Sequence, residues 1–151
     1  GSALDWPNSI SGMALAAPTL APGETPVNLQ NGAPPWPACA PAVERPAAVL
    51  PQFPADLPLP PGLLLFKSLS LHGNANNIQL VGYAPIPFGS AVRFVVDRLP
   101  AAGYNLGRGD SEGITEAEST FTGPGWTGGV RIASLMDCEA VTEWVIIVTK
   151  R

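Results

Sequence analysis

Two cysteines have the clearest chemical potential in this sequence. Cys39 and Cys138 are the only cysteines, and His72 is the only histidine. A thiol enzyme needs a histidine beside its cysteine and a zinc site needs several ligands, so both fit this inventory poorly. In an oxidising compartment, a disulfide is the simplest use of two cysteines, with two free thiols as the alternative. We therefore expect a Cys39–Cys138 disulfide, with no catalytic residue, cofactor or metal.

Acidic side chains form the one cluster of charges: Asp110, Glu112, Glu116 and Glu118. Such carboxylates could bind calcium, but the loop pattern typical of calcium sites is missing. Paired carboxylates also cleave glycosides, yet any acidic cluster meets that criterion. Arg108-Gly109-Asp110 spells an adhesion tripeptide, a match that arises readily by chance. The alternation of Glu116 and Glu118 favours the solvated face of a strand.

Three residues are candidate partner contacts: Trp36, Trp126 and His72. A tryptophan could line a groove for a sugar or a protein, although in a small domain it more often fills the core. Trp126 follows a Gly-rich turn and is the best candidate for exposure. His72 begins an Asn-rich turn, which could be a recognition loop or simply a solvated turn.

The composition limits the class of protein. The 151 residues fit one domain, and 46% of them are apolar, which is enough for a core. Eight basic against 12 acidic residues argue against a nucleic-acid-binding surface. No apolar run approaches the ~20 residues of a transmembrane span. Only 13% of the residues are charged, and with the many prolines this favours an exported protein whose signal has been removed.

Prolines divide the chain into two parts. Fourteen of the 18 prolines lie in residues 1–61, where they remove backbone donors and favour extended geometry. We expect residues 1–56 to form an extended arm, with a short helix at 40–50. A flexible linker is the alternative, but the arm carries large apolar residues, including Trp6, Val49 and Phe53. We therefore expect it to be partly packed on a domain at 57–151.

The domain begins with a predicted hairpin and a helix. Residues 65–71 and 77–84 read as paired strands, and Ile78, Leu80 and Gly82 share one face of the second strand. Ser90 is the expected helix N-cap, and Gly103 is the expected end signal. Helical spacing gives one apolar face: Val92, Val95, Val96 and Leu99. Arg93, Asp97 and Arg98 occupy the other side.

Three strands are expected after the helix. They cover residues 115–122, 126–135 and 141–150, and residues 104–108 are a candidate for a further, short strand. The last strand is the clearest, because β-branched residues occur throughout it. The sequence therefore predicts an α+β fold with the order ββαβββ. In it, an antiparallel sheet of about five strands carries one helix on one face, preceded by the extended Pro-rich arm.

Three motifs resemble a small, poorly characterised module of secreted proteins and lipoproteins of bacteria. They are Leu57-Pro58-Leu59-Pro60-Pro61-Gly62 before the first strand, Leu99-Pro100-Ala101-Ala102-Gly103-Tyr104 after the helix, and residues 121–129. The resemblance covers residues 57–150. It implies an extracytoplasmic location (periplasmic, cell-surface or secreted) and this fold, and it carries over no catalytic residues.

Three functions remain open at this point. The favoured one is a noncatalytic binding or assembly module of the cell envelope, whose arm and sheet edges contact a protein partner or a second copy. The alternative is a small-ligand-binding domain that uses the face of the sheet. An enzyme of unrecognised type is the least favoured. No nucleic-acid partner and no transmembrane segment are expected.

Overall fold

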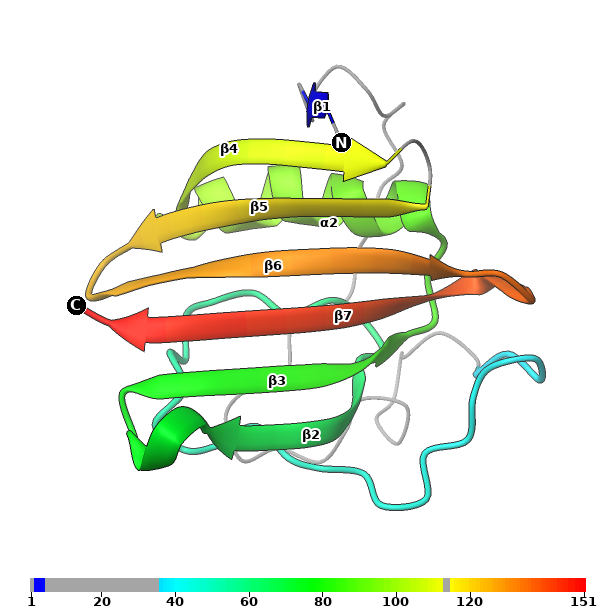
Figure 1. Cartoon of the computed structure of the whole chain (residues 1–151), viewed down its shortest axis with the longest axis horizontal. Helices are drawn as coiled ribbons and strands as arrows, with labels where there is room; N and C mark the ends of the chain where they lie inside the picture. The colour runs from blue at the N-terminus through cyan, green and yellow to red at the C-terminus, as the bar shows by residue number, and fades with distance from the viewer. Residues whose placement is uncertain (1, 5–35, 113–114) are drawn as a thin grey trace.

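The computed structural model describes residues 2–4, 36–112 and 115–151. In these residues the chain is α+β, as predicted: one antiparallel sheet with one α-helix, α2 (Phe88–Ala101) (Figure 1). A short 3-10 turn, η2 (Leu71–Gly73), links the first two strands of the domain. The strands are β1 (Ser2–Leu4), β2 (Leu64–Ser70), β3 (Asn77–Ala84), β4 (Asn105–Glu112), β5 (Glu116–Gly123), β6 (Trp126–Leu135) and β7 (Cys138–Lys150).

The sheet order is β1-β4-β5-β6-β7-β3-β2, with every neighbouring pair antiparallel. After β3, α2 carries the chain past three strand positions to β4. Successive connections through β5 and β6 then return it, so that β7 lies between β6 and β3 (Figure 1). Helix α2 thus links the two halves of this sheet.

The predicted strand count is wrong. Six strands, rather than about five, lie between residues 64 and 150, and β1 adds a seventh to the described sheet. The additional strand is β4, which contains Gly107 and Gly109 and no β-branched residue, so its local propensity opposes a strand. Pairing with β5 overrides this propensity, and a bulge between Leu106 and Gly109 accommodates the irregular register.

The helix differs from prediction at its start. It begins at Phe88 rather than after Ser90, and Ser90 is buried in its first turn. Phe88 packs against the core, which explains the earlier start. Gly103 has φ +93°, a left-handed conformation that suits the predicted end signal.

The buried face of α2 agrees with the predicted spacing except at two positions, 94 and 96. Val92, Val95 and Leu99 are buried, whereas Val96 is only half-buried. Phe94, which the helical spacing did not select, is buried instead. Its ring meets the indole of Trp144 edge-to-face with 6.1 Å between centroids. Contact with the large indole of Trp144 on β7 therefore adds Phe94 to the buried face of the helix.

The segment before β2 contributes to the same core. Val49, Phe53, Leu57 and Leu59 are all buried there, so packing continues across the expected boundary at residues 56–57. The predicted helix at 40–50 is wrong, because this stretch contains bends and one bridge, Ala47 to Leu65. Pro41 and Pro46 explain this, since each lacks a backbone donor and restricts the preceding residue. Residues 5–35 of the expected arm, with Trp6, lie outside the described residues.

Candidate functional site

One face of the sheet is packed and the other is open. Side chains alternate along β7, so Trp144, Ile146 and Val148 enter the core while Val145 and Ile147 point to the opposite face. Figure 1 looks onto this opposite face, with α2 behind the sheet. We call it the open face.

A hollow of about 720 Å³ lies on the open face over β4 to β7. We call it the open-face groove. Val145 and Ile147 are only half-buried beside it, and the bounding strands bring charged and hydroxyl groups to its rim. Its lining residues are Arg108, Glu118, Ser119, Thr120, Gly128, Gly129, Val130, Arg131, Val145 and Ile147.

A fixed ion pair flanks the groove. Arg131 donates to both carboxylate oxygens of Glu116, from Nε at 3.0 Å and from Nη2 at 2.7 Å. The hydrogen bond from Arg131 is the main reason that the pKa of Glu116 is lowered, and the same bond raises the pKa of Arg131. The charges of Glu118 and Glu143 also raise the pKa of Arg131. This arginine is therefore held by acidic neighbours.

A second hollow, of about 410 Å³, lies near the β2 edge. It is bounded by residues 42–45 and by an aromatic pair, Phe66 and Tyr83, whose ring centroids are 5.2 Å apart. Phe66 is 39% exposed, which is unusual for so large an apolar side chain. Burial raises the pKa of Tyr83, and the charge of Glu143 raises it further. We call Phe66 and Tyr83 the aromatic pair.

The predicted partner contacts lie on three different segments of the chain. His72 is exposed in the turn after β2, with φ 54°. Trp126 starts β6 and packs, half-buried, against the core rather than standing free. Trp36 is half-buried three positions before Cys39. Their assignment as partner contacts stays a prediction.

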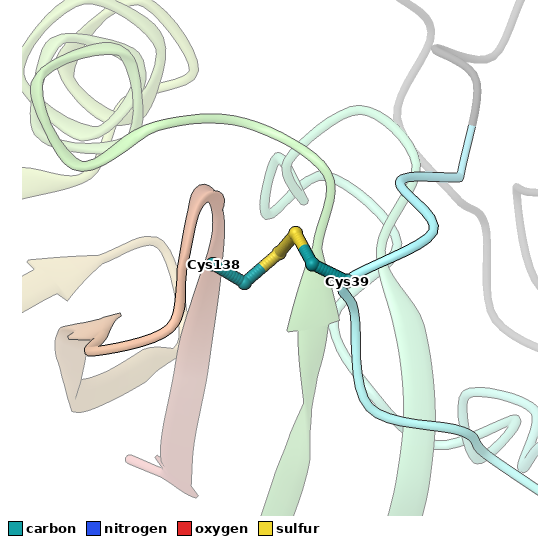
Figure 2. Close-up of a disulfide and its surroundings, with 2 residues drawn as sticks. All are labelled: Cys39 and Cys138. Carbon is teal, nitrogen blue, oxygen red and sulfur yellow. A yellow bond between two sulfur atoms is a disulfide. The ribbon is translucent and has the colours of Figure 1, made fainter.

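The predicted disulfide is present between Cys39 and Cys138 (Figure 2). Their Cα atoms are 5.5 Å apart, and Cys138 is buried at the start of β7 while Cys39 is exposed. The bridge attaches the Pro-rich segment to the end of the sheet where β6 turns into β7. Neither sulfur is a thiol in this state.

The register of β4 and β5 places Asp110 opposite Glu118 and Glu112 opposite Glu116, so the backbones of the four acidic residues lie side by side. On β5 the burial alternates as predicted. Ala117 and Ser119 are buried, whereas Glu118 is exposed and Glu116 pairs with Arg131. The side chains of Asp110 and Glu112 lie outside the description. Among the described residues, no group of three or more His, Cys, Asp or Glu side chains is arranged to hold a metal ion.

The sequence offers the sheet face as an alternative ligand site but does not identify the residues of the open-face groove. In the sequence, Arg108 belongs to a tripeptide and Glu118 to the acidic cluster. The available signal was the alternation of residues 116–122, which puts Glu118 and Thr120 on one face of β5. What sequence alone did not provide is the pairing of β5 with β4 and β6, which brings Arg108 and Arg131 to the same surface.

The fold and this surface define an α+β protein with one packed and one open sheet face. Comparison with family models, curated proteins and solved structures finds no match to this chain. The resemblance to a module of bacterial secreted proteins therefore stays a prediction.

Proposed function

We propose that this protein is a noncatalytic, extracytoplasmic binding module whose working surface is the open face of its sheet. The observation that carries the proposal is the hollow, partly apolar character of that face. Antiparallel sheets commonly leave one face in solvent, but that face is then usually polar. Here Val145 and Ile147 border a groove of about 720 Å³, and the aromatic pair lies nearer the β2 edge.

The sheet edges are less accessible than the sequence suggested. Ala47 donates its backbone N–H to the carbonyl of Leu65 at 2.8 Å, so part of the β2 edge is already bonded. At the other edge β1 pairs with residues 109–111 of β4. A partner strand would find only part of each edge free. We therefore assign the protein partner, or a second copy, to the open face first and to the arm and edges second.

An extracytoplasmic location is supported by the disulfide. Such bonds persist in oxidising compartments and are rare in the cytosol. The low charge of the chain and the resemblance to secreted bacterial proteins agree with this location. Among the described helices, none is long and apolar enough to cross a membrane.

The noncatalytic part of the proposal rests on the chemistry of the nucleophiles. Both cysteines are bonded to each other, and the single histidine, His72, is exposed in a turn. A nucleophile that depends on a base needs that base within hydrogen-bond reach.

The open-face groove also favours the second candidate function, a small-ligand-binding domain, because concave and partly apolar surfaces suit small molecules.

Affinity capture from native cell-envelope extract tests the proposal. Ile147→Lys adds a charge beside the groove, while Ala101→Lys adds the same charge to an exposed position on the helix. We expect the parent and Ala101→Lys to capture the same partner or second copy in equal amounts. We expect Ile147→Lys to capture at least about tenfold less of it. Equal capture by Ile147→Lys, with an unchanged melting temperature, would contradict the proposal.

A further inference from the structure

The lining of the open-face groove includes a glycine that packing does not require. Gly129 lies on β6 between Thr120 of β5 and Ile147 of β7. A Cβ built on Gly129 would meet only the carbonyl oxygen of Ser119, at 3.6 Å, which is an ordinary contact. A side chain would therefore fit there, and its absence leaves open space in the middle of the face.

The adjacent glycine is a contrast. A Cβ on Gly128 would clash with the backbone oxygen of Ile147 and would lie 2.9 Å from the ring of Phe121. Gly128 is thus required by the packing of the sheet on its core side. Packing explains the glycine at position 128 but not the glycine at position 129. The hollow at Gly129 is therefore a candidate for a functional feature.

The charges at the groove are not equivalent. Arg131 is held by Glu116 through two hydrogen bonds, and Glu118 and Glu143 also act on it. Arg108 lies on the opposite side of β5 and forms no ion pair with any side chain that the structure describes. An exposed arginine over an apolar floor favours an anion, and its planar fork matches a carboxylate in particular.

We propose that the open-face groove binds a small organic acid, with the carboxylate on Arg108 and the apolar body over Gly129 against Val145 and Ile147. The hydroxyl of Thr120, exposed on the same face, is placed to donate a further hydrogen bond. The volume of about 720 Å³ lies within the range of roughly 300–1,000 Å³ that small-molecule sites occupy. This inference rests on the proposed use of the open face and names a ligand class for it.

Octanoate is a suitable probe, because it joins one carboxylate to a flexible apolar chain. Binding is followed through the backbone amide signals of the oxidised full chain in a ¹H–¹⁵N NMR titration. Octanamide and octylamine serve as neutral and cationic analogues. We expect octanoate to saturate with a Kd of about 1 mM or below, shifting the amides around Gly129 and Thr120. Octylamine is expected to bind at least about tenfold more weakly.

Two variants separate the charge from the cavity. Arg108→Gln is expected to weaken octanoate about tenfold and to leave octanamide unchanged, because it removes only the charged contact. Gly129→Val fills the hollow with a residue suited to a strand and is expected to abolish the binding of both. Arg93→Gln removes a cation from the helix, on the other side of the sheet, and is expected to change neither.

Three results would overturn the inference: no saturable shift at Gly129 or Thr120, equal octanoate affinity in Arg108→Gln, or octanoate shifts confined to other surfaces. Arg108→Gln keeps the test decisive if Gly129→Val melts early. Failure here is distinguishable from failure of the proposed function. If Ile147→Lys still loses its captured partner while octanoate does not bind, only the ligand assignment is wrong.

Discussion

The hydroxyl of Tyr104 donates a hydrogen bond to the carboxylate of Asp56, which precedes it by 48 positions. Tyr104 is fully buried, and its ring packs edge-to-face on Phe121 with centroids 5.8 Å apart. Asp56 lies within the Pro-rich stretch before β2, whereas Tyr104 follows α2. This bond therefore joins the Pro-rich segment to the half of the sheet that the helix covers.

Tyr104→Phe tests this link. Burial and the bond to Asp56 raise the pKa of Tyr104 above its ordinary value near 10. The contribution of this raised pKa to the free energy of unfolding is complete below about pH 10. Above that pH the contribution declines by at most about 1.4 kcal/mol per pH unit, because the tyrosine of the unfolded chain loses its proton first. The variant should lose about 1 kcal/mol at neutral pH and show a shallower alkaline decline, measured by urea unfolding.

Asp56→Asn is the matched control for Tyr104. It keeps an oxygen acceptor and removes the charge, so we expect a smaller loss of stability than in Tyr104→Phe. The account of this bond fails if the parent and Tyr104→Phe lose stability equally steeply above about pH 10.

Removing the disulfide should destabilise the protein strongly. The bridge spans 99 positions, and in the chain-entropy model a loop of ~100 residues contributes about 4.7 kcal/mol, though measured values are often lower. The double variant Cys39→Ser/Cys138→Ser should therefore unfold at lower urea than the oxidised parent. Thiol titration of the denatured, unreduced parent should detect no free thiol, and two thiols per chain would refute the bridge.

Neighbouring glycines on β6 should respond differently to alanine. Gly128→Ala forces a Cβ against the backbone of Ile147 and should cost about 1–3 kcal/mol. Gly129→Ala has room for its methyl group and should change stability by less than about 0.5 kcal/mol. Thermal melts of the two variants measure the difference, and equal losses would show that the groove glycine is structural after all.

The buried face of α2 gives a test of the core. Val95 is fully buried, so Val95→Asp leaves an unpaired carboxylate in an apolar environment and should unfold the domain. Arg93 pairs with the exposed Asp97 at 2.7 Å, and such surface pairs contribute little, so Arg93→Ala should stay within about 0.5 kcal/mol of the parent. Thermal unfolding is followed by circular dichroism. A Val95→Asp variant that melted at the same temperature as the parent would contradict this assignment of the buried face of α2.

Sequence patterns predicted the elements with strong periodicity. The strand at 77–84 and the strand at 126–135 have the predicted bounds, and the helix has most of its predicted buried face. β4 was underestimated because its glycines oppose a strand locally, and only pairing with β5 fixes it. The helix start also depended on a tertiary contact, the packing of Phe88, that no local signal reports.

The candidate site was less predictable than the fold. Cysteine count and composition were sufficient for Cys39–Cys138. The open-face groove depends on strand order, because Arg108, Thr120 and Gly129 come from three strands whose register is set by pairing. In the aromatic pair, Phe66 is the residue without a strand partner at the register shift between Leu65 and Lys67, and this shift likewise depends on the pairing of β2 with β3.

Site-specific photocrosslinking tests most directly whether the open face is the working surface. A photoreactive amino acid is placed at Thr120, on the open face, or at Asp97, on the helix; both positions are exposed. Each oxidised protein is irradiated in native cell-envelope material, and adducts are resolved by mass. We predict one discrete adduct, with a partner or a second copy, from Thr120 and none from Asp97. Adducts from Asp97 alone would contradict the account.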